Sequence, residues 1–266
     1  MSDIADDLLT EYRSLAELCA TLTPDQWRQT TDFYGWTPWD EIAHLLLFDE
    51  AALLAVKDAA AFAADTAVLA RAIAAGEEMS TIARRRYGVL DGATLVAVWR
   101  QKHEALVEAL AGMDPKARLP WYGPTMSARS FMTARLMETW AHGQDIWDML
   151  GRARPPGPGL RHICHLGVTT YGWAFINRKL QVPAPVPLVE LEAPDGATWT
   201  WGEPSDVDFV CGPALDFALL VTQRRNRLDT KLTWSGDGAE QWTRIAQCFA
   251  GDPADGPPPG SRISPR

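Results

Sequence analysis

The feature that most constrains the fold is a proline- and glycine-rich segment, RARPPGPG at Arg152 to Gly159, which separates two stretches of different character. Before it, apolar residues recur every three or four positions, which is the spacing of amphipathic helices. After one further helical stretch, the second part changes to short alternating runs bounded by turn residues, which is typical of strands. A chain of 266 residues also exceeds the most common size of a single domain. The sequence therefore predicts two domains of different classes.

We expect an α+β protein with an antiparallel four-helix bundle over residues 1–152, a linker helix and a smaller α/β domain over 153–251, and a flexible tail over 252–266. Helices are predicted at 3–22, from Pro38 onward, from Asp58 to about Gly76, after Asp91-Gly92, from Ser127 to about Gly151, from Leu160 to about Phe175, at 213–222 and from Ala239 to about Phe249. Strands are predicted on both sides of Pro194-Asp195-Gly196, at Val207 to Cys211 and at LTWSG.

The charge and cysteine content exclude several classes of protein. A net charge of -9 and a pI near 5.1 disfavour binding to nucleic acid or to an anionic membrane surface, because both depend on clustered Lys and Arg. The cysteines are scattered among apolar residues, which predicts reduced core residues and a cytoplasmic protein; they are Cys19, Cys164, Cys211 and Cys248. The acidic, amphipathic first residues do not resemble a signal peptide, and no apolar run approaches a membrane span. Small molecules are therefore the expected partners.

One predicted helix carries a carboxylate and an imidazole one turn apart. Glu138 and His142 are four positions apart, so both side chains project from the same face and can bind a single ion. Large apolar residues surround the pair, which predicts burial. A buried ionised glutamate needs a compensating partner, and a metal ion would supply it. Taken alone, such a pair is more often part of an ordinary solvated helix face than a metal site.

A second imidazole lies on the helix that begins near Pro38. His44 is embedded in an apolar run, where a histidine is either a metal ligand or a hydrogen-bonded core residue. With Glu138 and His142 it would complete two imidazoles and one carboxylate, the ligand set of a catalytic zinc site with an open fourth position. Iron or nickel could use the same set. Helix-bundle cores commonly hold such sites.

Two short motifs resemble those of a known family. Gly-Trp-Thr-x-x-Asp-x-x-x-His ends at His44, and Glu-x-x-x-His-x-x-Asp runs from Glu138 to Asp145. Together they resemble the metal-binding maleylpyruvate isomerase family, the thiol-dependent branch of the DinB-like helix bundles. The sequence LLVTQRR, which ends at Arg225, resembles the sterol-carrier-protein-like domain of the same family. The resemblance covers nearly the whole chain and implies a DinB-like bundle followed by that domain.

The resemblance also implies a metal site and a reaction. His44, Glu138 and His142 would bind a divalent metal, preferably Zn, and a low-molecular-weight thiol such as mycothiol or glutathione would be the second cofactor. Two neutral imidazoles and one carboxylate leave the bound ion with net positive charge, which would lower the pKa of a coordinated thiol. Addition of the thiolate to a conjugated double bond, rotation and elimination would convert a cis to a trans acid.

Cationic residues would be needed to bind a substrate carboxylate or the developing enolate. Arg224 and Arg225 are the candidates that the resemblance implies, although the Gly-x-Arg typical of the family reads Gln223-Arg224-Arg225 here. Arg129 and Arg135 are alternatives on the bundle side.

Other polar residues near the proposed ligands have less defined roles. Asp145 would orient an imidazole or accept a proton, or would be a solvated helix charge. His103 is expected to line the pocket or, preferably, to be a core residue. His162 and His165 are three positions apart without a third partner, so they are not predicted to be ligands.

Three classes of function fit these residues. The first is a thiol-dependent isomerase or transferase that acts on a small unsaturated acid. The second is a non-catalytic protein that binds a metal or a small ligand, and the third is a hydrolase with metal-activated water. Three protein ligands favour an enzyme, because a structural zinc site normally recruits a fourth, such as Asp145 or His103. The first class is therefore our prediction.

Overall fold

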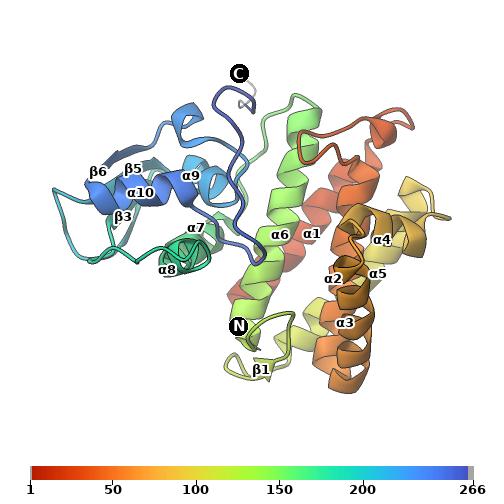
Figure 1. Cartoon of the computed structure of the whole chain (residues 1–266). Helices are drawn as coiled ribbons and strands as arrows, with labels where there is room; N and C mark the ends of the chain where they lie inside the picture. Colours follow the sequence, from red (N-terminus) through yellow and green to blue (C-terminus); the bar gives the residue numbers. More distant parts are fainter. Residues whose placement is uncertain (1, 263–266) are drawn as a thin grey trace. The chain divides into compact units, whose positions relative to one another are not determined.

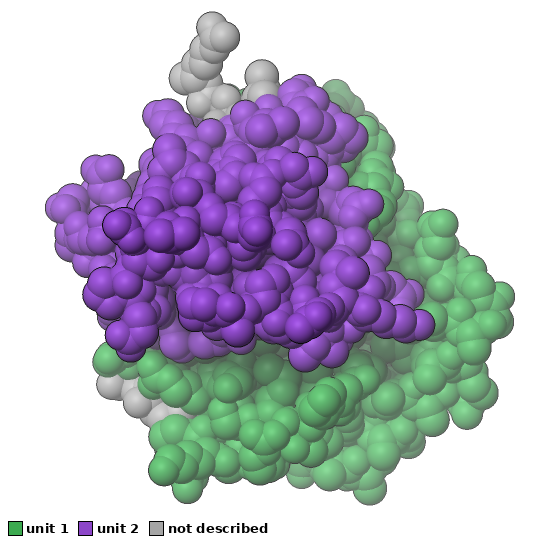
Figure 2. Space-filling model, turned by 60° about the vertical axis from the view of Figure 1, so that its left-hand side comes forward, with its two compact units in different colours: residues 1–152 green, residues 153–266 purple. Residues whose placement is uncertain are grey.

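The structure is a computed structural model, and it describes residues 2–262. The chain divides into two compact units, Met1–Arg152 and Ala153–Arg266, which Figure 2 shows in separate colours. The described part of unit 1 is helical apart from a short two-stranded ribbon, and unit 2 combines helices with a sheet (Figure 1). The protein is therefore of the α+β class, as predicted. None of the described helices is both long and apolar enough to span a membrane.

Unit 1 is organised around four long helices. They are α1 (Ser2–Ala20), α2 (Pro38–Lys57), α5 (Gly92–Ala111) and α6 (Ala128–Met149). Both α1 and α2 pack against α5 and α6, so their apolar faces enclose a common core (Figure 1). The smaller elements are η1 (Gln26–Arg28), α3 (Ala59–Ala74), α4 (Met79–Tyr87), β1 (Arg118–Leu119) and β2 (Met126–Ser127). Of these, α3 and α4 pack against α2.

The Thr-x-x-Asp part of the first motif fixes the start of α2. Thr37 Oγ1 accepts a hydrogen bond from the Asp40 backbone N–H at 3.4 Å, the Asp40 carboxylate accepts from the Thr37 N–H at 2.9 Å, and Pro38 is in the first turn. Asp40 is also bound by two nitrogens of Arg84 in α4, at 2.7 and 2.6 Å. This cap places His44 in the second turn of α2, as predicted.

The interface between α2 and α6 is a series of polar pairs within an otherwise apolar core. From one end to the other, the pairs are Glu41 with His142, His44 with Glu138, and Asp49 with Arg135. Residue numbers rise along α2 as they fall along α6, which shows that the two helices are antiparallel. Every pair joins the two helices, so these polar residues lie along the interface between α2 and α6.

The Asp49–Arg135 pair belongs to a larger group of hydrogen bonds around the Asp49 carboxylate. Its carboxylate is fully buried and accepts from Tyr12 Oη at 2.6 Å, Trp99 Nε1 at 2.8 Å and Arg135 Nε at 2.8 Å. These partners lie on α1, α5 and α6, so a single anion connects all the long helices. Arg135, which the sequence offers as a cation for the substrate, therefore has its Nε committed to the core. Burial of this carboxylate is tolerated because each of its partners is a good donor.

His103 on α5 is a core residue. It is fully buried, stacks on the ring of Tyr12 with a centroid separation of 4.3 Å, and meets the ring of Trp99 edge-on. Burial lowers the pKa of His103 to about 3, and Arg100 and Arg13 act in the same direction. The unfolded chain binds a proton near the ordinary pKa of about 6.5, whereas the folded chain excludes it. The stability contributed by His103 is therefore complete above that pH and is lost as the pH falls toward 3.

This pH dependence gives a first prediction. Lowering the pH from 7 to 5 should reduce the free energy of unfolding by about 2 kcal/mol through His103 alone. Urea denaturation of the wild type and of His103→Phe, which keeps the ring stack, should show this decrease in the wild type and a smaller one in the variant. Equal decreases in the two proteins would contradict the assignment.

Unit 2 contains a four-stranded sheet with the order β4-β3-β5-β6. Its strands are β3 (Leu188–Glu192), β4 (Thr198–Trp201), β5 (Phe209–Pro213) and β6 (Thr233–Ser235). β3 and β4 form the predicted antiparallel hairpin, β3 and β5 are parallel, and β5 and β6 are antiparallel. The longer helices of the unit are α7 (Leu160–Thr169), α8 (Tyr171–Ile176), α9 (Ala214–Val221) and α10 (Asp237–Ile245). Of these, α9 packs on β3, β5 and α7.

The linker helix differs from the prediction because it is interrupted. The hydroxyls of Thr169 and Thr170 donate to the carbonyls of His165 and Leu166 at 2.9 and 2.7 Å. Such bonds back to the preceding turn compete with the regular ladder and bend helices. The stretch predicted as one helix therefore forms α7 and α8.

The described residues after Gly251 make hydrogen bonds to other parts of unit 2. The side-chain amide of Gln223 donates to the Ala254 carbonyl at 2.6 Å, and that of Asn226 donates to the Pro257 carbonyl at 2.9 Å. Proline-rich backbone keeps its carbonyl acceptors, which these amides satisfy. Residues 263–266 of the predicted tail lie outside the described residues.

Candidate metal centre

His44, Glu138 and His142 come together in unit 1, as the sequence predicts. Each offers a donor atom, and the three atoms lie within 4.8 Å of one another. Glu138 Oε2 is 3.7 Å from His44 Nε2 and 3.4 Å from His142 Nε2. Ligand atoms of a tetrahedral zinc ion, bound at about 2.0–2.2 Å, lie roughly 3.3–3.6 Å apart. The donor set and its spacing therefore fit one divalent ion.

The three side chains differ in their access to solvent. The side chain of His142 is 4% exposed and that of His44 is 14% exposed, whereas that of Glu138 is 27% exposed. The two imidazoles thus form the inner part of the centre, and the carboxylate forms its outer part. A further ligand would approach from the side of Glu138.

The ionisation states also suit metal binding. Burial and, to a smaller extent, the neighbouring His142 lower the pKa of His44 to about 4 against the opposing effect of Glu138, so His44 is neutral at pH 7. Burial by itself raises the pKa of Glu138, but the neighbouring imidazoles of His142 and His44 outweigh it and hold the pKa well below its usual range. A neutral imidazole and an ionised carboxylate are the forms that bind a metal ion.

Glu41 is a member of the centre that the sequence analysis missed. It is fully buried, and its Oε2 lies 2.6 Å from Nδ1 of His142, while its Oε1 accepts from Thr31 Oγ1 at 3.0 Å. Its position three residues before His44 places both on one side of α2, and this is the signal in the sequence. The pairing with His142 depends on the register between α2 and α6, which the sequence does not specify.

Asp145 lies beside this pair. It is fully buried, and its carboxylate is within 4.8 Å of the ligand atoms of Glu41 and His142. Nδ1 of His142 is hydrogen-bonded to Glu41. The structure thus places Asp145 near the centre, beside the carboxylate that binds His142.

The Gly-Trp part of the first motif forms a tight turn against the imidazoles. Gly35 has a φ of 70°, which favours glycine, and the Thr31 N–H donates to the Trp36 carbonyl at 2.7 Å to close the turn. The Trp36 ring stacks on His142 with a centroid separation of 5.9 Å and lies 5.3 Å from His44. The motif therefore supplies an aromatic wall for the centre as well as the cap of α2.

Other aromatic rings continue this wall. Phe33 of the turn meets His142 edge-on at 5.2 Å, and Phe48, one turn after His44 on α2, lies 4.7 Å from the His44 ring. Phe48 in turn contacts Trp121 of the loop between β1 and β2 at 6.2 Å. The faces of the imidazoles are thus covered by hydrocarbon, which excludes water from all but the outer side.

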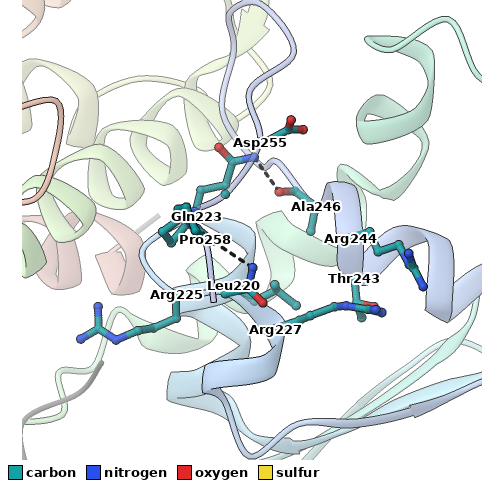
Figure 3. A pocket seen from close by; sticks show the side chains of 12 residues that line it. Leu220, Gln223, Arg225, Arg227, Thr243, Arg244, Ala246, Asp255 and Pro258 are labelled. Carbon is teal, nitrogen blue, oxygen red and sulfur yellow. Dashed lines mark hydrogen bonds between the residues drawn. The ribbon is translucent and has the colours of Figure 1, made fainter. Parts of the chain in front are cut away.

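Arg224 and Arg225 belong to unit 2. Both follow α9 and are buried, and their backbone N–H groups donate to the Leu219 carbonyl at 2.8 and 3.1 Å. Arg225 borders a cavity of about 170 Å³, where its side chain points away from those of Arg227 and Arg244 (Figure 3). Of the alternatives, Arg129 is exposed at the start of α6, and Arg135 pairs with Asp49 as described above.

Among the described residues, the remaining histidines and the cysteines belong to neither of the groups that could hold a metal ion. In unit 2, His165 Nδ1 accepts from Trp201 Nε1 at 3.2 Å. All the cysteines are free of disulfide bonds, and every one except the half-buried Cys211 is buried. Burial raises the pKa of Cys19 and that of Cys164, so both stay protonated thiols in the core.

Comparisons with known proteins agree with this geometry. The family model of the mycothiol maleylpyruvate isomerase N-terminal domain matches residues 8–147, a span that contains all three candidate ligands. Two proteins of Mycobacterium tuberculosis, the uncharacterized proteins MT0041 of strain CDC 1551 / Oshkosh and Rv0036c of strain ATCC 25618 / H37Rv, are each 43% identical over 251 residues. These alignments cover 94% of this chain and 96% of either relative.

Among solved structures, the crystal structure of the mycothiol-dependent maleylpyruvate isomerase has a TM-score of 0.53 and 15% sequence identity, and covers 87% of this chain and 92% of its own. A mutant of that enzyme has a TM-score of 0.50 and 14% identity, and covers 81% of this chain and 88% of its own. At this identity the likeness shows a shared fold. The family model of the N-terminal domain matches more than half of the chain. The chain therefore belongs to the mycothiol-dependent maleylpyruvate isomerase family.

Proposed function

We propose that the protein is a metal- and thiol-dependent isomerase or transferase that acts on a small unsaturated acid or a related electrophile. The observation that carries the proposal is the convergence of His44, Glu138 and His142, with donor separations of 3.4 and 3.7 Å, inside the part of the chain that matches the family. Thiol dependence is supported by the name of the structural relative, a mycothiol-dependent enzyme.

The ligand set supports a bound zinc ion, and mycothiol or glutathione is the proposed thiol. Such an ion, when bound, favours the thiolate form of a thiol that coordinates it. The finer assignments of the fold, a DinB-like bundle and a sterol-carrier-protein-like domain in a cytoplasmic protein, belong to this proposal too.

Residues of this chain would have distinct roles in the reaction. Neutral His44 and ionised Glu138 are in the forms that bind the ion, and Glu138 borders the side from which thiol and substrate enter. The aromatic wall excludes water from the imidazoles. Asp145 is the proposed proton acceptor, and Arg224 and Arg225 are the proposed partners of a substrate carboxylate.

The proposal is tested with protein loaded with cobalt or zinc. Addition of mycothiol to the cobalt form should produce a sulfur-to-cobalt charge-transfer band, and the zinc form with thiol should convert maleylpyruvate to its trans isomer, followed by NMR. Glu138→Gln should lose both signals. Glu50→Gln makes the same chemical change on α2, where Glu50 pairs with Arg86 and Lys102 instead, and should keep both.

Other results of this experiment would favour a different class of function. Binding of thiol without conversion of any unsaturated acid would favour a binding protein. Hydrolysis that needs the ion but no thiol would favour the hydrolase. Absence of the cobalt band at a loaded centre would contradict thiol dependence.

A further inference from the structure

We infer that Glu41 is a positioning residue for the candidate metal centre, which fixes the tautomer and the orientation of His142, and that His44 has no equivalent support. The two imidazoles are therefore unequal ligands, with His142 the fixed one. The part of this inference that concerns metal affinity rests on the proposed function. The part that concerns the tautomer does not depend on any metal.

The first step is the hydrogen bond itself. Glu41 Oε2 lies 2.6 Å from His142 Nδ1, and both side chains are buried. An ionised carboxylate only accepts, so beside ionised Glu41 the proton is on Nδ1. In the neutral imidazole, Nε2 then has the lone pair, and this atom faces Glu138 Oε2 at 3.4 Å. A metal ion between these two acceptors would satisfy both, which is the arrangement of a metal ligand and its supporting carboxylate.

The second step is that Glu41 is itself held in place. Its other oxygen, Oε1, accepts from Thr31 Oγ1 at 3.0 Å, and Thr31 closes the turn that carries Trp36. The Trp36 ring is nearly parallel to that of His142, with an interplanar angle of 9°. Thr31 thus connects Glu41, which binds the edge of the His142 ring, with the turn that carries Trp36, which covers the face of that ring. His142 is restrained in both directions.

The third step is the contrast with His44. Nδ1 of His44 is buried and makes no hydrogen bond to any residue that the structure describes. Its ring is flanked instead by Trp36 and Phe48, with centroids at 5.3 and 4.7 Å. To bind a metal through Nε2, a neutral His44 must keep its proton on this unsatisfied Nδ1, which is unfavourable. Of the two imidazoles, only His142 has its tautomer set in advance by a hydrogen bond.

The first test uses the metal-free protein and long-range ¹H–¹⁵N NMR of the imidazoles. His142 should be the Nδ1–H tautomer in the wild type and in Glu41→Gln, whose amide oxygen can still accept the bond. Glu41→Leu should lose this preference. An Nε2–H tautomer in the wild type, or an unchanged tautomer in Glu41→Leu, would overturn the inference.

The second test measures zinc affinity by competition with a chelator. Glu41→Leu should bind zinc about 10–100-fold more weakly than the wild type, Glu41→Gln should show a smaller loss, and Glu50→Gln should show none. His142→Ala should lose more affinity than His44→Ala. Circular dichroism shows whether each metal-free variant is folded. If Glu41→Leu does not fold, the tautomer of His142 in the wild type decides the question.

The two tests separate the inference from the proposed function. If the wild type binds no zinc, the proposed function fails, and the tautomer of His142 still decides the role of Glu41. If zinc binds equally well to the wild type and to a folded Glu41→Leu, the inference fails while the metal site stands.

Discussion

Replacing Arg135 with methionine is expected to destabilise the protein by about 3–5 kcal/mol. Among the described residues that hydrogen-bond to Asp49, only Arg135 carries a positive charge. Without it, the Asp49 carboxylate would stay fully buried between the long helices of unit 1. Tyr12 and Trp99 would still donate to Asp49, but neutral donors do not offset the cost of burying an isolated anion. Urea denaturation followed by circular dichroism measures the loss.

Two further variants control this experiment. Arg129→Met, a change of the same kind at an exposed position of α6, should alter the stability by less than about 0.5 kcal/mol. The double variant Asp49→Leu/Arg135→Met should lose less stability than the sum of the losses in the two single variants. Each single variant leaves one buried charge without its partner, whereas the double variant removes both charges. A change below about 1 kcal/mol for Arg135→Met would show that Asp49 does not depend on it.

The second large effect concerns the ligand. Zinc at a free concentration about 1,000 times its Kd should raise the free energy of unfolding by about 4 kcal/mol, since an ion bound to the folded state stabilises it by mass action. A chelator should reverse the gain, and Glu138→Gln should show none. The gain should also shrink at acidic pH, because protons then compete for the imidazoles.

Glu50→Gln again serves as the matched control, and its stability should respond to zinc as the wild type does. An equal gain in Glu138→Gln would place the ion elsewhere on the chain. No gain in the wild type would mean that the folded protein has no zinc site.

Local signals accounted for much of what the structure shows. The capping residues Thr37 and Ser127 define the starts of α2 and α6, and these starts place His44 and Glu138 at known turns of their helices. The hairpin around Asp195 and Gly196 was equally predictable, because its turn residues stand between alternating runs. In these cases the information lies within a few residues of the feature.

Features that depend on the register between distant segments were not predictable. Glu41 and Asp49 are unremarkable acidic residues in the sequence, and only the packing of α2 on α6 reveals that one holds His142 and the other holds Arg135. The break before α8 was missed for a different reason, since a threonine hydroxyl can bond to the preceding turn or point to solvent, and the sequence does not say which.

The central claim is that His44, Glu138 and His142 hold one metal ion, and its most direct test is the zinc content of the purified protein after loading and dialysis, measured by mass spectrometry. The wild type should retain close to one equivalent, and His44→Ala, Glu138→Ala and His142→Ala should each retain clearly less, with His142→Ala among the lowest. A wild type that stays metal-free, or three variants that keep a full equivalent, would contradict the account.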